Sequence, residues 1–74
     1  MKKYNDVLKD LREDRDLEQK TVAKAMGIDT SYYGKYERGV HPLPIEKLII
    51  LCKFYNVSAD YILGLPDDMP FPKK

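Results

Sequence analysis

Apolar residues recur along this chain at the spacing of α-helices rather than β-strands. In residues 4–15 they stand at i, i+3, i+4 and i+7, which places them in one stripe along a helix. Asn5 and Asp6 suit the start of this helix, because an asparagine can cap a backbone amide and an acid favours the positive helix end. The pattern predicts a first helix with a charged outer face. The residues of its apolar stripe are Tyr4, Val7, Leu8 and Leu11.

Two shorter helices are predicted on either side of a glycine. The first covers residues 18–26. Gly27 allows the left-handed backbone that a sharp helix-ending turn requires. Asp29 is a good N-cap for the second of these helices, which we expect over residues 30–38 and which ends at Gly39. The residues predicted to face inward from the helix before the turn are Val22, Ala23 and Met26.

The helix after the turn has two dissimilar sides. Tyr33 and Tyr36 are three residues apart, so both can face the core. The opposite side carries small and hydrogen-bonding residues, and a small residue on an exposed helix allows a partner to come close. This side is the candidate binding surface. Its residues are Thr30, Ser31, Gly34 and Lys35, with Tyr32 beside them.

The second half of the chain predicts two more helices and a tail. Residues 45–55 are the most hydrophobic segment and follow a rigid proline-containing loop. Ser58 is predicted to cap a short fifth helix that ends at Gly64. Residues 65–74 contain three prolines and no helical period, which predicts an extended or disordered end. The apolar face expected on the fourth helix consists of Ile45, Leu48, Ile49, Leu51, Cys52 and Tyr55, with Ile50 and Phe54 off it and partly exposed.

Composition and charge narrow the classes of function. The chain of 74 residues is one domain by length, and its net charge of +1 means that nucleic-acid binding would depend on where the charges lie. One cysteine and one histidine form neither an internal disulfide nor a zinc site, so we expect no metal and no cofactor. No stretch is apolar for long enough to span a bilayer and no signal peptide is visible, so we expect no membrane association and a cytoplasmic location.

The residues that catalysis needs do not combine in this sequence. Cys52 falls in the apolar stripe of the fourth helix, which predicts a core residue, and a catalytic cysteine would need a nearby base. The only histidine, His41, belongs to a loop predicted to lie at a distance. The sequence also lacks paired acids and a phosphate-cradling glycine loop. We therefore expect that the chain is not an enzyme.

The order of these elements resembles the Xre/Cro-type helix-turn-helix family, which includes the phage repressors. The resemblance covers about residues 5–64 and rests on LEQKTVAKAMGI, DTSYYGKYERG, the proline loop, IEKLIILCKFYNVS and ADYILG. It implies an all-α, compact bundle of five helices like the lambda-repressor DNA-binding domain, over residues 1–64. The helix-turn-helix would be formed by the second and third helices, and the third helix would enter the major groove of DNA.

The resemblance also implies which residues touch double-stranded DNA. Lys35 would reach guanine or a phosphate, and Thr30 offers a methyl group to thymine. Gln19 matches the glutamine with which the family grips a phosphate. Arg12 and Glu37 match an ion pair that ties the first helix to the third. The residues expected at the DNA are Gln19, Asp29, Thr30, Ser31, Tyr32, Gly34, Lys35 and Arg38.

These expectations lead to a function and to an alternative. The first hypothesis is a sequence-specific transcriptional regulator, a repressor, acting as a homodimer on a two-fold operator and without a small-molecule effector. Glu18 near the phosphate path and the loop 40–44, in which His41 is the sole candidate for a phosphate contact, imply weak binding per monomer. The alternative is a protein-interaction module on the same fold, such as an antitoxin or a regulatory partner subunit. The candidate dimer surface is Ile50, Phe54, Met69 and Phe71.

Overall fold

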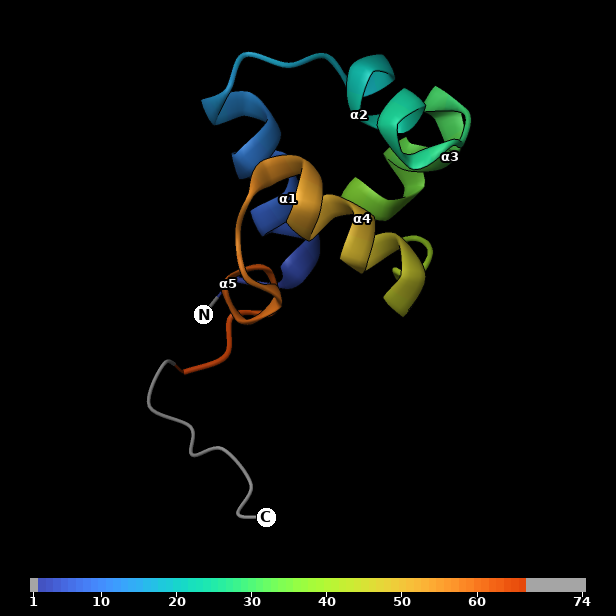
Figure 1. Ribbon diagram of the computed structural model, residues 1–74. Helices are drawn as coiled ribbons and strands as arrows, with labels where there is room; N and C mark the ends of the chain where they lie inside the picture. The colour runs from blue at the N-terminus through green and yellow to red at the C-terminus, as the bar shows by residue number, and fades with distance from the viewer. Residues whose placement is uncertain (1, 67–74) are drawn as a thin grey trace.

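The computed structural model describes residues 2–66, and this part of the chain forms five helices (Figure 1). The predicted all-α fold is therefore confirmed. The tail residues Met69 and Phe71, proposed for a dimer surface, lie outside the described residues. None of the helices within residues 2–66 has the length and apolar character needed to cross a membrane. The helices are α1 (Tyr4–Asp14), α2 (Gln19–Met26), α3 (Thr30–Glu37), α4 (Ile45–Tyr55) and α5 (Ala59–Leu63).

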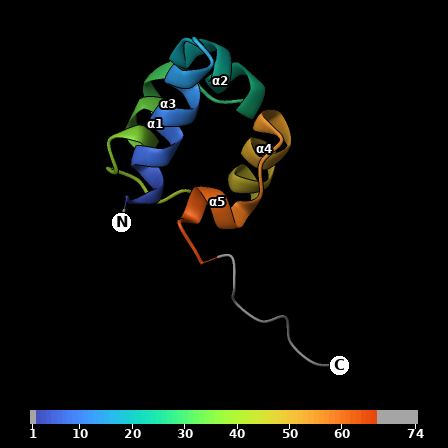
Figure 2. The ribbon, with the colours of Figure 1, turned by 90° about the vertical axis from the view of Figure 1, so that its left-hand side faces the viewer.

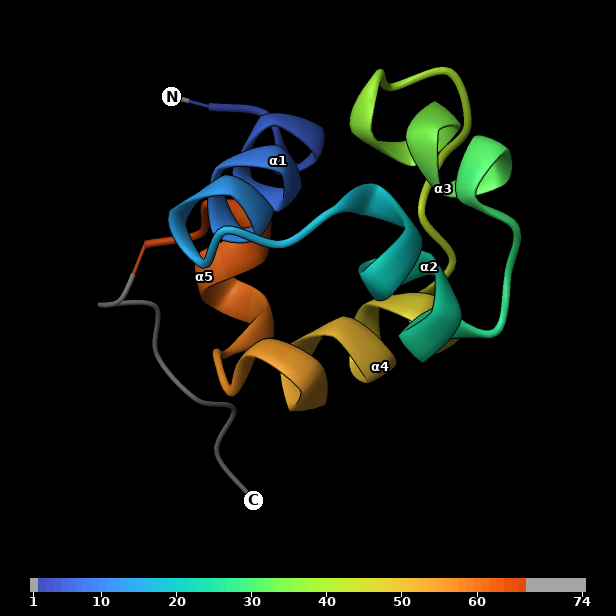
Figure 3. The same ribbon diagram turned by 90° about the horizontal axis from the view of Figure 1, so that it is seen from above.

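The main contacts between the helices close a ring around one core. α1 packs on α3 and α5, α3 packs on α2, α2 packs on α4, and α4 packs on α5. Figure 2 shows this ring, and Figure 3 shows α2 beside α3, with α5 crossing close to α1. Apolar side chains from all five helices fill the centre. They are Leu8, Leu11, Val22, Ala23, Met26, Tyr33, Tyr36, Leu51, Tyr55 and Ile62.

The ends of the helices follow the predicted turn chemistry. Gly27 has φ 72° and ends α2, and the amide of Ile28 bonds the carbonyl of Ala23 at 3.0 Å. Asn56, with φ 56°, ends α4 in the same left-handed conformation. The hydroxyl of Ser58 accepts a hydrogen bond from the amide of Tyr61 at 3.2 Å and caps α5. The local sequence therefore determines where these helices stop and start.

Asn5 is not the cap of the first helix, and this prediction was wrong. α1 begins at Tyr4, with Lys3 in the cap position, so Asn5 lies inside the first turn. Its side chain is then turned toward the end of α3, where Nδ2 donates a hydrogen bond to the carbonyl oxygen of Glu37 at 3.3 Å. Asn5 thus joins α1 to α3 instead of capping its own helix.

α4 buries a narrower face than its apolar residues predict. Leu51 and Tyr55 are fully buried and Cys52 is partly buried against the core. Ile45 and Ile49, however, are 75% and 47% exposed. At 3.6 residues per turn they lie roughly 80–120° around the helix from Tyr55. Because α4 packs mainly on α2 and α5, its outer flank is left uncovered, and the predicted placement of Ile45 and Ile49 in the core is wrong.

Candidate nucleic-acid interface

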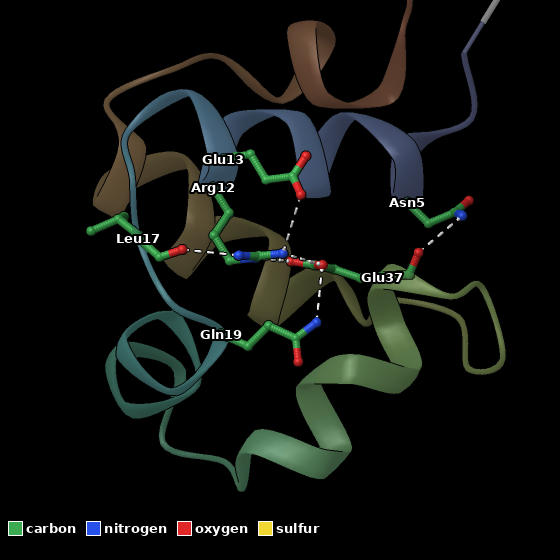
Figure 4. Close-up of polar contacts among 6 residues, drawn as sticks. All are labelled: Asn5, Arg12, Glu13, Leu17, Gln19 and Glu37. Carbon is green, nitrogen blue, oxygen red and sulfur yellow. Dashed lines mark hydrogen bonds and ion pairs between the residues drawn. The ribbon is translucent and has the colours of Figure 1, made fainter.

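Glu37, at the end of α3, is the centre of a polar cluster that joins three helices (Figure 4). Its carboxylate accepts hydrogen bonds from Arg12 Nε at 2.7 Å and Arg12 Nη2 at 3.1 Å. It also accepts one from Gln19 Nε2 at 3.2 Å. Arg12 Nη1 donates to the carbonyl of Leu17 at 2.9 Å, so the same guanidinium fixes the segment that leads into α2. The expected Arg12–Glu37 pair is present and holds α2 and α3 in one orientation relative to α1.

The environment of Glu37 favours its charged form. Burial alone would raise the pKa of a carboxyl group that is only 7% exposed. The hydrogen bonds from Arg12 and Gln19 outweigh burial, and the pKa of Glu37 is lowered. The hydrogen bond to Glu37 in turn raises the pKa of Arg12. Both groups are therefore ionised around neutral pH, and the pair is a charged clamp inside the fold.

Two buried tyrosines complete the inner side of this cluster. Burial raises the pKa of Tyr33, and the negative charge of the nearby Glu37 raises it further. Burial also raises the pKa of Tyr55 to about 12. Arg15 lies over the Tyr55 ring with its guanidinium carbon 5.2 Å from the ring centroid. Neither hydroxyl has a hydrogen-bond partner within the described residues, so Tyr33 and Tyr55 contribute through their buried rings, in the core positions that were predicted.

The exposed side of α3 carries most of the residues predicted to read DNA. Thr30 and Ser31 are exposed, Tyr32 is 39% exposed and Lys35 is partly exposed. Asp29 precedes the helix with an extended backbone. Because the first amides of a helix have no intrahelical acceptor, the backbone at this end can donate to a phosphate even though the Asp29 side chain is acidic.

Gly34 is not on the exposed side, and this placement needs correction. The residue is buried. A β-carbon built on it would lie 3.1 Å from Arg38 Nη1 and 3.5 Å from Gln19 Oε1. The side chain of Gln19 from α2 and that of Arg38 from the end of α3 lie across the glycine and cover it. Gly34 therefore makes room for two predicted phosphate contacts instead of facing a base itself.

The loop after α3 contributes an aromatic contact that the sequence did not reveal. Gly39 has φ 73°, which turns the chain back toward α3. The His41 ring then lies against Tyr32, with 5.3 Å between the ring centroids. Tyr32 also meets Tyr36 edge to face at 5.3 Å. Lys35 Nζ is 5.8 Å from the Tyr32 ring centroid. The left-handed glycine two residues before His41 is the only sequence signal of this arrangement.

Comparison with known proteins gives this arrangement a family. A model described as helix-turn-helix matches residues 8–62. The chain belongs to the Cro/C1-type helix-turn-helix family. It is 46% identical over 70 residues to YobD of Bacillus subtilis (strain 168), an uncharacterized HTH-type transcriptional regulator, and the match covers 95% of this chain and 62% of YobD.

Two further relatives come from phage and restriction systems. The chain is 37% identical over 54 residues to the cryptic phage CTXphi transcriptional repressor RstR of Vibrio cholerae. The matched region covers 73% of this chain and 49% of RstR. The crystal structure of the restriction-modification controller protein C.AhdI from Aeromonas hydrophila superimposes with a TM-score of 0.73 at 27% identity, over 80% of this chain and 86% of that one. The chain thus spans about three-fifths of the length of YobD and about half of that of RstR.

Within the helix-turn-helix unit, the predicted residues fall into two groups. Gln19 and Arg38 lie together over Gly34, between the start of α2 and the end of α3. Lys35 and Tyr32 lie together on the exposed side of α3. The first group combines a side-chain amide with a guanidinium, and the second combines an ammonium group with an exposed aromatic ring.

Proposed function

We propose that this chain is a sequence-specific DNA-binding regulator of transcription, and specifically a repressor. The observation that carries the proposal is the rigid presentation of the exposed side of α3, held on α1 and α2 by the Arg12–Glu37–Gln19 cluster. The similar proteins support the same function, since YobD is described as a transcriptional regulator, RstR as a transcriptional repressor and C.AhdI as a restriction-modification controller. A protein with this function works on the nucleoid, in the cytoplasm.

The proposed binding mode places α3 in the major groove. Thr30, Ser31 and Lys35 then face base edges, where an ammonium group pairs with guanine O6 or N7 and a threonine methyl with the thymine methyl. Gln19 would bind a phosphate while it remains bound to Glu37. Its side-chain amide carries two hydrogens, and the carboxylate of Glu37 accepts only one of them. Glu37 thereby orients the second hydrogen in advance of DNA binding.

Arg38, Tyr32 and the amides after Asp29 supply the remaining backbone contacts in this proposal. Arg38 is exposed, and its guanidinium lies beside Gln19 over Gly34. Glu18 opposes the phosphates, although its carboxylate is 3.9 Å from Lys20 Nζ. Both of these side chains are exposed, so the pair neutralises the acid only weakly. The balance is a small number of favourable contacts for each chain.

We further propose that the regulator acts as a homodimer on a two-fold operator, without a small-molecule effector. Because its net charge is +1 and its exposed α3 surface is short, one chain is expected to have little affinity for DNA. Two chains joined in a dimer bind the same duplex with a higher overall affinity. Of the predicted dimer residues, Ile50 packs partly against the core, whereas Phe54 is 37% exposed. Half-sites one helical turn apart, about 34–36 Å, are expected for such a dimer.

Selection from random genomic fragments tests the proposed function. The wild-type chain is expected to enrich a palindromic sequence, and its affinity is expected to fall steeply as salt rises. Lys35→Ala is expected to weaken binding to the enriched sequence. Lys9→Ala is the matched control, because it removes the same charge from an exposed position on α1. Absence of any enriched sequence at low salt contradicts the proposal and favours the protein-interaction module instead.

A further inference from the structure

The loop between α3 and α4 carries a further inference, which rests on the proposed function. After Gly39 the chain turns back, and the amides of Val40 and His41 both approach the carbonyl oxygen of Lys35, at 2.9 Å and 3.4 Å. The backbone of Lys35 is therefore tied to the same loop that carries His41. This tie fixes where the imidazole ring lies relative to α3.

The ring of His41 packs against the exposed aromatic residue of the reading surface. The His41 and Tyr32 rings are inclined by 35°, and Tyr32 also meets Tyr36, which is 2% exposed. Tyr32 thus contacts both a loop residue and a core residue. A tyrosine on an exposed helix surface without such neighbours would be free to change its side-chain rotamer.

The position of Lys35 depends on the packing of Tyr32 against His41 and Tyr36, because the Lys35 ammonium group lies near the Tyr32 ring. The nitrogen is 5.8 Å from the ring centroid, within the range of a cation–π contact. Such a contact is weak at an exposed site, yet it selects one direction for a long side chain that has many rotamers. The direction it selects is toward Tyr32, which precedes Lys35 by three residues on α3.

We propose that His41 is a positioning residue for base recognition: through Tyr32 it holds the Lys35 ammonium in the direction from which it reads a guanine. His41 itself need not touch DNA for this role. Loss of the imidazole would release Tyr32 and then Lys35. The chain would keep its general attraction to phosphates and would lose part of its discrimination between sequences.

The loop that carries His41 is also held from the α1 side, where the amide of Leu43 donates to the hydroxyl of Tyr4 at 3.2 Å. The His41 ring is therefore carried by a segment that is hydrogen-bonded to both α3 and α1.

The test compares two substitutions of His41. His41→Ala removes the ring, whereas His41→Phe keeps an aromatic ring in its place. For each chain, Kd is measured over a salt series for the enriched operator duplex and for the same duplex with its half-site guanines replaced. Discrimination is the ratio of the two Kd values, and thermal unfolding of each variant checks that it is folded.

Two results are expected from this comparison. His41→Ala lowers discrimination roughly three- to tenfold, at the low end of what a full base contact provides. His41→Phe keeps most of the discrimination, because an aromatic ring still packs against Tyr32.

Other results overturn the inference. If His41→Ala weakens binding to both duplexes equally and lowers the salt slope by about 0.9, His41 is a phosphate contact and not a positioning residue. If His41→Ala leaves the ratio unchanged, or His41→Phe loses as much discrimination as His41→Ala, the contact between the His41 and Tyr32 rings has no role in positioning Lys35. If these results are found and the wild-type chain still selects an operator sequence, the inference about His41 fails but the proposed function stands. A wild type that selects none overturns both.

Discussion

Glu37 is buried at the end of α3 and is held there by Arg12 from α1 and Gln19 from α2. Taking a carboxylate and a guanidinium out of water costs several kcal/mol for each ion, and the close, two-pronged geometry of the pair offsets that cost. Removing one partner leaves the other charge buried without compensation. The stability of the fold is therefore more sensitive to this pair than to any exposed charge.

We predict that Arg12→Ala lowers the free energy of unfolding by about 3–5 kcal/mol, because Glu37 is left buried and unpaired. Urea unfolding followed by circular dichroism measures the change. Lys9→Ala on the same helix is the control, since an exposed charge is expected to change stability by no more than about 0.5 kcal/mol. Equal midpoints for the two variants would contradict the role assigned to the pair.

The lowered pKa of Glu37 also predicts the response to acid. Because its folded pKa lies below the ordinary value of 4.5, its contribution to stability is complete above that value. The contribution is lost as pH falls through the folded pKa. Between pH 7 and pH 3, the urea midpoint is expected to drop further in the wild type than in Glu37→Gln, which has no carboxyl group to titrate. Parallel profiles for the two proteins would count against this assignment.

A substitution at Gly34 is expected to affect the stability of the fold and the affinity for DNA differently. An alanine at a helix interior is favoured over glycine by about 1 kcal/mol, and the group it would meet first is the flexible end of Arg38. Gly34→Ala is therefore expected to leave stability unchanged or raise it, while it displaces the guanidinium of Arg38 and weakens DNA binding. Urea unfolding and a Kd measured on the same preparation test both effects. A variant that binds as tightly as the wild type would show that Gly34 does not position Arg38.

At the scale of helices, the turn between α2 and α3 depends on one backbone conformation. Gly27 has φ 72° with nothing within 4 Å of the position a β-carbon would take. Gly27→Ala therefore costs only backbone strain, about 1–2 kcal/mol. Gly27→Asn is the matched variant and is expected to cost less, since asparagine tolerates the left-handed region. Thermal unfolding of the two variants gives the order, and a reversed order would contradict this account of the turn.

The helices themselves could be predicted from the sequence, because their signals are local. The spacing of Val22, Ala23 and Met26, the glycine after them and the cap at Ser58 specify structure within a few residues. Tyr33 and Tyr36 were placed in the core for the same reason, and both are buried there.

The errors all arise between helices. Asn5 was expected to cap α1 but reaches α3, and Ile45 was expected in the core but lies on a flank of α4 that α2 and α5 leave uncovered. Gly34 is buried only because Gln19 and Arg38 lie over it, and His41 meets Tyr32 only because Gly39 turns the loop back. No pattern within one helix records such contacts, since they depend on how separate segments pack.

For the whole molecule, the ring of helices holds α3 at the surface with its base-facing side free. Each helix packs on two neighbours, so a change at one contact is shared around the ring. One such molecule presents few contacts to DNA, so two molecules are expected to be needed for function. The assembly state on DNA is therefore the decisive property at this scale.

We predict that two chains bind each operator. Light scattering of the complex between the full chain and an operator duplex measures the number of chains directly. A truncation after Gly64 tests whether residues 65–74 supply the dimer surface, because the dimer is then lost when they are removed. One chain per two-fold operator at saturating protein would contradict the homodimer.

The central claim is that the exposed side of α3 reads DNA sequence through Lys35. It is tested most directly by measuring Kd over a salt series for the enriched operator duplex and a scrambled duplex of the same composition, with the wild type, Lys35→Ala and Lys9→Ala. The account predicts that Lys35→Ala loses most of the preference for the operator, by a factor that corresponds to about 1–3 kcal/mol, while Lys9→Ala keeps it. An equal preference for the operator in all three proteins would contradict the claim.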